Sequence, residues 1–216
     1  FIKKNLEELL KQYPFNYSSD AIFWKSLQIE TDGTELVCDL GGADFPNKGM
    51  LNMWSNKEVP YHAKAPWHKM VRRDFIEKHN LKFDEFIGSE DMMFSLKLAT
   101  ALEKFALYDS VIYVYEKREN SLETGFARKL QCNKMNASIT ATKYLRSINK
   151  LEYRDAAPFY LWRLKHSQPV MFIWFLIKEV LVLGPKIAIA DYKEVAKSDG
   201  VSANPFVFVW RKIRRK

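Results

Sequence analysis

The sequence predicts a mixed α/β fold whose C-terminal part is helical. Two stretches rich in β-branched and aromatic residues, 20–40 and 109–121, indicate strands. Apolar residues recur at helical spacing around these stretches, and from residue 156 onward the pattern is mostly helical. Strands interleaved with helices predict an α/β domain, here with fewer strands than a complete one would have.

The first half of the chain alternates between helical and extended patterns. Residues 2–13 predict a helix that a proline ends. Residues 20–40 predict two strands joined by a hairpin turn at Asp32 and Gly33, where glycine supplies a positive φ. The further predicted elements are a short helix or loop over 47–57, a helix over 72–80, an extended stretch over 81–86, a helix from residue 90, a strand over 109–121 and a helix over 133–150.

The stretch "FIGSEDMMFSLKLA" places Glu90 and Asp91 where a turn gives way to an apolar helical pattern. Ser89 is a good N-cap residue, and acids in a first turn interact favourably with the positive end of the helix dipole. The predicted buried face of this helix comprises Phe94, Leu98, Ala101, Leu102 and Phe105. Two interpretations remain open, because the acids either only cap the helix or carry chemistry.

Composition indicates a globular protein with an anionic partner. The chain has 216 residues, of which 47% are apolar and 28% charged, and its net charge is +8. Five of the cations lie in 210–216 and three more Lys and Arg in 68–73. Such clusters suit nucleic acid, a membrane surface or a phosphorylated substrate, while a solvated basic face is the alternative.

Cys38 and Cys132 lie far apart in the sequence, which indicates a reducing compartment rather than a disulfide framework. The four histidines show no metal-ligand spacing, so we expect no self-contained zinc site. No signal-peptide pattern opens the chain, and it starts within a helical pattern without Met, so we expect a preceding N-terminal portion. Lys178 and Glu179 interrupt the apolar run 169–184, which is shorter than the roughly 20 residues of a membrane span.

Two stretches between residues 60 and 125 each contain a series of short motifs, and the order of these motifs along the chain is informative. "APWHKMVRRDFIEKHNLKFDEFIGSEDMMFSLKLA" contains Trp-x-Lys, a basic pair, an aromatic-bearing helix, a Phe-bearing strand and Glu-Asp before an apolar helix. "VIYVYEKRENSLET" contains Tyr-x-Tyr, Arg and Ser. This order resembles the acceptor-side half of inverting GT-A glycosyltransferases of family 2, which build bacterial surface polysaccharides. The matching residues are Trp67, Lys69, Arg72, Arg73, Phe75, Phe83, Glu90, Asp91, Phe94, Tyr113, Tyr115, Arg118 and Ser121.

The resemblance is loose over 1–40 and weak beyond residue 150. It implies that 1–130 is the acceptor-side part of a GT-A-like catalytic domain, followed over 131–216 by a mainly helical region with a basic tail. The family's donor half, with nucleotide-binding strands and a metal-binding Asp-x-Asp, has no counterpart here, and neither GxGxxG nor GxxxxGK[ST] occurs. We therefore expect a longer enzyme, with a missing portion of roughly 90 residues through which Mn or Mg would enter.

The resemblance also implies roles for individual residues. Inverting transfer needs a base for the acceptor hydroxyl, and the family's Glu-Asp pair supplies it. Asp91 is accordingly expected to be the base and Glu90 its acceptor-orienting neighbour, with the reverse assignment open. Trp67 would offer a flat face to a sugar ring, with His68 and Tyr113 also at the acceptor. The alternative for Trp67 is a place in the core.

Lys69 and Arg118 are the candidates for the leaving diphosphate, where cations stabilise negative charge. Their alternative is surface solvation, which weighs more for Lys69. The expected partners are a nucleotide-sugar donor and a glycan or lipid-linked acceptor. The expected location is the cytoplasm, with 206–216 binding the anionic inner face of the cell membrane. The rival function is a non-enzymatic module that holds nucleic acid, but the aromatic residues are not interleaved with Lys and Arg, so no nucleic acid is expected.

Overall fold

The computed structural model describes residues 2–12, 19–38, 58–85, 87–118, 127–154 and 156–198. Contacts within the chain divide it into two compact units. The first comprises 1–85 and 90–124, and the second comprises 86–89 and 125–216. The contact boundary thus lies at residue 124, whereas the sequence places the domain boundary at 130. Each unit is described by itself below.

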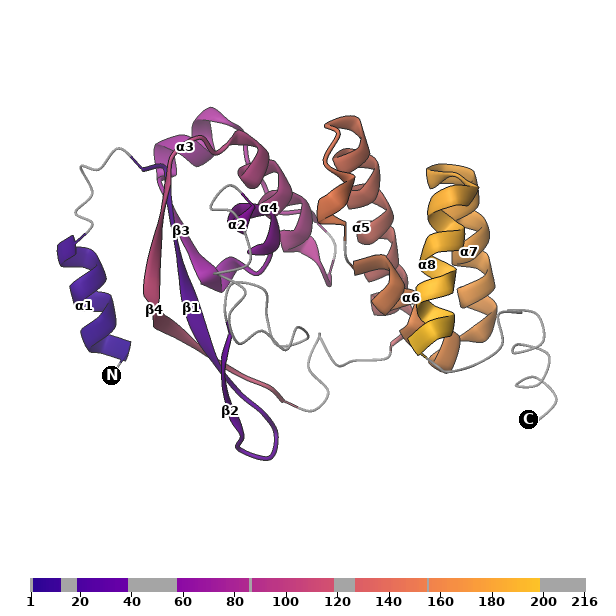
Figure 1. The fold of residues 1–216 in the computed structure, drawn as a ribbon, viewed down its shortest axis with the longest axis horizontal. Coiled ribbons are helices and arrows are strands. Elements are labelled where there is room, and N and C mark those ends of the chain that lie inside the picture. Colours follow the sequence, from indigo (N-terminus) through magenta and orange to yellow (C-terminus); the bar gives the residue numbers. More distant parts are fainter. Residues whose placement is uncertain are drawn as a thin grey trace. The chain divides into compact units, whose positions relative to one another are not determined.

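The first unit contains the strands and the helices that cover them (Figure 1). Its elements, in chain order, are α1 (Ile2–Gln12), β1 (Ala21–Ile29), β2 (Glu35–Cys38), α2 (Val59–His62), the 3-10 helix η2 (Pro66–His68), β3 (Lys69–Val71), α3 (Arg73–Lys78), α4 (Glu90–Ala101) and β4 (Phe105–Glu116). These elements, with the helical region that follows, confirm the predicted mixed α/β class at that coarse level.

Strand β1 is the centre of a small mixed sheet. It pairs in parallel with β4 along its whole length, from Ala21 with Phe105 to Ile29 with Glu116. On its other edge, β1 pairs antiparallel with β3 at its start and with β2 at its end. The predicted hairpin between β1 and β2 is confirmed, with Gly33 at a φ of +84°. The sheet therefore sets β3 and β4 on opposite edges of one central strand.

Helices cover both faces of this sheet because β1 carries apolar residues on each. On one face Ile22 packs with Leu9 of α1 and Ile112 of β4. On the other face Phe23 packs with Val59 and Ala63 at α2. Figure 1 shows α1 on one side of the strands and α2 to α4 on the other. Helices that bury both faces stabilise this four-stranded sheet.

Several boundaries differ from the sequence-based predictions. The helix from Glu90 ends at Ala101, and Phe105 begins β4 instead of ending the helical face. α4 also buries residues on more than the one predicted face, including Met92, Ser95 and Leu96. The predicted helix over 72–80 is confirmed as α3, while β3 and α2 were not predicted because three or four residues carry no periodicity. The predicted element over 47–57 lies outside the described residues.

The second unit is helical, as the sequence predicts from residue 156. Its helix α5 is 20 residues long and begins earlier than the predicted residue 133. The elements are α5 (Arg128–Ser147), the 3-10 helix η3 (Leu151–Tyr153), α6 (Ala156–Ser167), α7 (Pro169–Leu183) and α8 (Pro185–Ser198). Proline stands at the first position of both α7 and α8, where its missing N–H costs no hydrogen bond. Gly184 separates these two helices at a φ of +91°.

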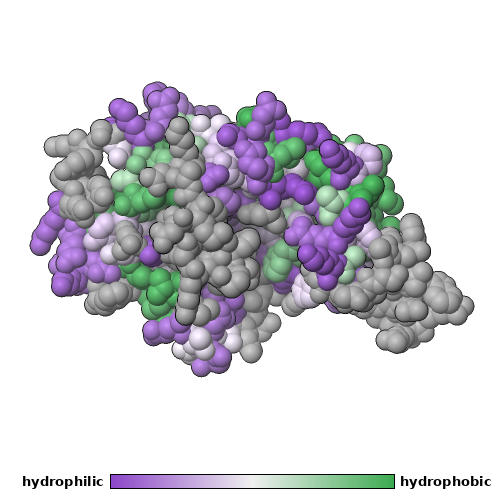
Figure 2. All heavy atoms as spheres, in the orientation of Figure 1, coloured by the Kyte–Doolittle hydropathy of each residue, from purple (hydrophilic) through white to green (hydrophobic). Residues whose placement is uncertain are grey.

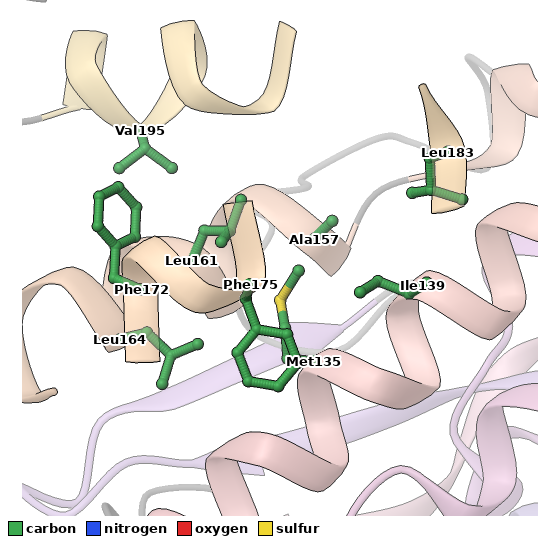
Figure 3. Close-up of a cluster of buried hydrophobic side chains, with 9 residues drawn as sticks. All are labelled: Met135, Ile139, Ala157, Leu161, Leu164, Phe172, Phe175, Leu183 and Val195. Carbon is green, nitrogen blue, oxygen red and sulfur yellow. The ribbon is translucent and has the colours of Figure 1, made fainter. Parts of the chain in front are cut away.

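One apolar cluster joins the four helices of this unit. It contains Met135 and Ile139 of α5, three residues of α6 and Phe172 and Phe175 of α7. Figure 3 shows these side chains pointing toward one another, with Leu183 and Val195 completing the cluster. Within the described residues, no helix is both long enough and apolar enough to cross a membrane.

Residues 87–89 pack on α5 although the chain enters α4 directly after them. The side chain of Asn133 donates a hydrogen bond to the carbonyl of Ile87 at 3.0 Å. Gly88 has a φ of +88°, and a Cβ on it would lie 2.4 Å from a methyl of Leu130. The positive φ and this close approach together favour glycine at position 88.

Candidate functional site

The Glu-Asp pair lies in the first turn of α4, as the sequence predicts. Both side chains are partly buried, and the residues that follow them in the helix are buried. Ser89 has a φ of +75°, whereas N-cap residues normally have extended backbone. Its hydroxyl lies 3.4 Å from that of Tyr160. The ordinary cap geometry that the capping interpretation assumes is therefore not adopted by Ser89.

Burial raises the pKa of Asp91, and the negative charge of Glu90 raises it further. Hydrogen bonding to the backbone and the positive charge of Lys69 both oppose that rise. A carboxylate whose proton affinity is increased in this way is a better base near neutral pH than an exposed one. This setting is compatible with the predicted role of Asp91 as a general base, which stays a prediction.

Lys69 is the cation that faces this carboxylate, and it is buried. Its ammonium donates to the hydroxyl of Ser95 at 2.8 Å and to the backbone carbonyls of Ala63 and Lys64. Ser95 in turn donates to the carbonyl of Lys64 at 2.5 Å. Burial lowers the pKa of Lys69 to about 7, against the attraction of Asp91. The surface-solvation alternative for Lys69 is therefore wrong.

The network explains how β3 and α4 are held together at this point. Asp91 and Ser95 are four residues apart on α4 and so share one face of the helix. Lys69 reaches that face from β3 and has acceptors for its three donors. The contact of Lys69 with a diphosphate stays a prediction. To make it, the ammonium would have to exchange these hydrogen bonds for bonds to phosphate oxygens.

Trp67 stacks on the two tyrosines of β4, which are two residues apart and so occupy one face of that strand. Its ring lies 5.0 Å from that of Tyr115 at 6° and 5.9 Å from that of Tyr113 at 18°. The backbone carbonyl of Trp67 accepts a 2.8 Å hydrogen bond from the indole of Trp24. The rings are partly exposed, and this stack is called the aromatic surface of the first unit.

His68 is fully buried behind this aromatic surface. Its Nδ1 lies 3.3 Å from the carbonyl of Trp24, and its Nε2 is buried without a hydrogen-bond partner among the described residues. Burial lowers the pKa of His68 to about 4, and the charge of Lys69 acts in the same direction. The ring is therefore neutral at pH 7. Its predicted contact with an acceptor stays a prediction and would require the ring to become exposed.

Arg118 lies at the end of β4 with 79% of its side chain exposed, and it forms a 3.5 Å ion pair with Glu116. Its predicted diphosphate contact also stays a prediction. Ser121, the last residue of the resemblance, lies outside the described residues. The basic pair Arg72 and Arg73 forms ion pairs with acids of α3, within two and four residues.

A pocket of about 510 Å³ lies at the other end of α4. Its lining residues include Arg72, Phe75, His79 and Ala101. Asp91 is ten residues before Ala101, which corresponds to about 15 Å along the helix. The pocket therefore does not belong to the Glu-Asp site.

Sequence reasoning missed two parts of the site. Ser95 carries a signal that could have revealed it, because it is a polar residue four positions after Asp91 in an otherwise apolar helix. The carbonyls of Ala63 and Lys64 carry none, because any residue supplies a backbone acceptor. In the described parts of the chain, no group of three or more His, Cys, Asp or Glu is placed to hold a metal ion.

In comparisons with known proteins, no family model, curated protein or solved structure matches this chain.

Proposed function

We propose that this chain is the acceptor-side part of an inverting glycosyltransferase, with Asp91 as the general base. The observation that carries the proposal is the setting of Asp91. It is a partly buried carboxylate with a raised pKa at the start of α4, beside the buried Lys69, and it occupies the place of the Glu-Asp pair in the resemblance. A carboxylate held on a rigid helix by neighbouring hydrogen bonds suits proton abstraction.

In this reaction the acceptor hydroxyl gives its proton to the Asp91 carboxylate. The freed oxygen attacks the anomeric carbon from the face opposite the leaving group, and the bond from that carbon to the phosphate oxygen breaks. The nucleoside diphosphate leaves with the bonding electron pair. The positive charge of Lys69 opposes the rise in the pKa of Asp91 that burial causes, and so favours the ionised carboxylate.

The acceptor would lie against the aromatic surface of Trp67 and Tyr113, because the C–H faces of a sugar pack well on aromatic rings. The donor is a nucleotide-sugar, with Arg118 as the cation that reaches its phosphates. Mn or Mg, held by the proposed preceding portion, would neutralise the leaving phosphates. A glycan or a lipid-linked acceptor fits a cytoplasmic enzyme at the inner face of the membrane.

Asp91→Asn in the product of the complete reading frame tests the proposal. If Asp91 is the base, release of nucleoside diphosphate from a panel of nucleotide-sugars should fall by about 10²- to 10⁴-fold, while thermal unfolding shifts little. Glu90→Gln should lower turnover less. Glu85→Gln, at an exposed acid outside the helix, is the matched control and should leave turnover unchanged.

The capping interpretation predicts the opposite pair of results. Asp91→Asn would then lower the free energy of unfolding by a few tenths to about 1 kcal/mol, because the charge–dipole interaction is lost. Turnover would stay near that of the unaltered enzyme, and this result would remove Asp91 from the mechanism.

A further inference from the structure

The outer face of α7 is an apolar row that the fold leaves exposed. Val170, Trp174, Ile177 and Leu181 follow one another at intervals of four, three and four residues, which places them on one face of the helix. Their exposed fractions are 67%, 57%, 49% and 80%. The opposite face of α7 supplies Phe172 and Phe175 to the buried cluster. A helix that is apolar on both sides is normally covered on both sides.

The neighbouring helix α8 presents cations on its own outer face. Lys186, Lys193 and Lys197 are all exposed and share the spacing of the apolar row on α7. The acids of α8 are Asp191, which is buried, and Glu194, which is exposed, so three exposed lysines stand against one exposed acid on this helix. α7 and α8 pack side by side, and in Figure 2 hydrophobic surface adjoins hydrophilic surface over this pair of helices. The outer surface of the hairpin therefore combines apolar contact area with excess positive charge.

We propose that the α7–α8 hairpin binds the surface of an anionic lipid membrane, with the row Val170, Trp174, Ile177 and Leu181 in the interfacial layer and the lysines of α8 among the headgroups. An apolar row with an aromatic residue, next to a row of lysines, is the composition of helices that lie in the membrane interface. Because the inner face of α7 packs on the cluster of the second unit, only its outer face meets the lipid.

The positive charge of this surface favours an anionic lipid membrane over two other possible occupants, a second copy of the chain and the segment 206–216. A symmetric contact between two copies would bring the same lysines of α8 together across the interface, where like charges repel. The segment 206–216 carries five cations and would meet the same repulsion if it folded over the face. Anionic headgroups instead neutralise the lysines, each of which adds to the attraction near the surface. This membrane contact is separate from the catalytic proposal and does not depend on it.

Co-sedimentation of the 216-residue chain with phosphatidylcholine vesicles, with and without phosphatidylserine, tests the proposal. The unaltered chain should bind the vesicles that contain phosphatidylserine. The double variant Trp174→Ser/Leu181→Ser should bind at least about tenfold more weakly, because it loses apolar contact with the interface. Val37→Ser, at an exposed apolar position of β2 in the other unit, is the matched control and should bind normally.

Two lysine double variants separate the electrostatic contribution to membrane binding from the apolar contribution. Lys186→Ala/Lys193→Ala should weaken binding only to the anionic vesicles, whereas Lys3→Ala/Lys4→Ala on α1 should not. Circular dichroism verifies that the variants are folded, which is expected because every changed side chain is exposed. Deletion of 206–216 should leave part of the binding in place.

Three results would overturn the proposal. The first is absence of vesicle binding by the unaltered chain. The second is unchanged binding by Trp174→Ser/Leu181→Ser, which would assign any binding to the tail. The third is a dimer of the unaltered chain in size-exclusion chromatography that this double variant converts to a monomer, because the face would then be occupied by a second copy.

Discussion

At the scale of single residues, two buried ionisable groups have pKa values displaced in opposite directions. Lys69 in the first unit has a pKa lowered to about 7, and Glu179 in the second has a pKa raised to about 8. Burial is the main cause of both, since it penalises the charged form of either group. Each displacement makes the stability of the protein depend on pH, with opposite sign.

For Lys69, the ordinary pKa of 10.5 lies above the folded value of about 7. Between these values the unfolded chain binds the proton more strongly, so the stability of the first unit should rise as the pH rises from about 7 to about 10.5. Lys69→Met keeps the apolar stem and should abolish this rise. Denaturant midpoints at several pH values measure it, with Lys97→Met, at an exposed position of α4, as the control. Equal pH dependence in Lys69→Met and the unaltered protein would contradict the prediction.

The raised pKa of Glu179 makes the stability of the protein depend on pH with the opposite sign. It lies on α7 and is fully buried with Asp191 of α8, whose negative charge raises its pKa further, while Arg154 opposes the rise. Arg154 itself contacts Asp191, and Glu194 adds negative charge to that site. Because the folded pKa exceeds the ordinary value of 4.5, the folded state holds the proton more strongly. The stability that this proton contributes should be lost as the pH rises from about 4.5 through about 8.

Glu179→Gln should remove that loss, because the amide stays neutral throughout. The measurement is the difference in denaturant midpoint between pH 5 and pH 8.5, compared with that of the unaltered protein. Glu152→Gln, at an exposed acid of the same unit, should keep the original pH dependence. If the Glu179→Gln and unaltered proteins lose stability equally over this range, the buried proton is not the cause.

At the scale of elements, the segment 87–89 packs on α5 and leads directly into α4. Gly88 has two reasons to be glycine, its φ of +88° and its closeness to Leu130. Gly184 between α7 and α8 has only a backbone reason, since nothing lies within 4 Å of a Cβ built on it, and its φ of +91° with a ψ of +159° is a conformation that essentially only glycine adopts. The steric cost at position 88 can be measured separately by changing Leu130 as well.

Gly88→Ala should lower the free energy of unfolding, because the positive φ costs an L residue about 1–2 kcal/mol and overpacking against Leu130 adds about 1 kcal/mol or more. Chemical denaturation of Gly88→Ala, Leu130→Ala and the double variant measures the steric part. Gly88→Ala should cost less where Leu130 is already alanine, and an equal cost in both backgrounds would show that Leu130 is not the obstacle.

At the scale of the whole molecule, the net charge of +8 allows association with any polyanion. In the described structure several aromatic rings stack on one another, as Trp67 does on Tyr115 and Phe83 on Phe94. Rings engaged in this way offer less surface for bases than an open groove would. We therefore expect any binding of single-stranded oligonucleotides to be electrostatic and nonspecific.

A salt titration with a fluorescent single-stranded oligonucleotide measures this. Kd should be no tighter than roughly 10⁻⁴ to 10⁻⁶ M at physiological salt and should weaken steeply as salt increases. Nanomolar binding that persists in high salt would favour the rival function of a nucleic-acid-binding module.

The sequence by itself determined the elements whose patterns are long. The helical character of the second unit, the hairpin with Gly33 and the helix from Glu90 follow from local periodicity and turn chemistry, and the structure confirms them. The start of α5 at Arg128 and the division of 156–198 into three helices were not predicted. The fold class at its coarse level follows in the same way. The short β3 and α2 could not be predicted, because they exist only through pairing and packing with β1 and α4.

Tertiary structure alone decided the environments of the candidate site residues. Lys69 and His68 are buried by segments distant in the sequence, such as the helix that carries Ser95, 26 residues from Lys69. That burial is what lowers the pKa of His68 and keeps its ring neutral. The exposure of the apolar row on α7 was decided in the same way. Its residues are as hydrophobic as those of the buried face, and only the packing of α5, α6 and α8 determines which face remains outside. Local patterns specify elements, whereas burial and pKa depend on which segments the fold brings together.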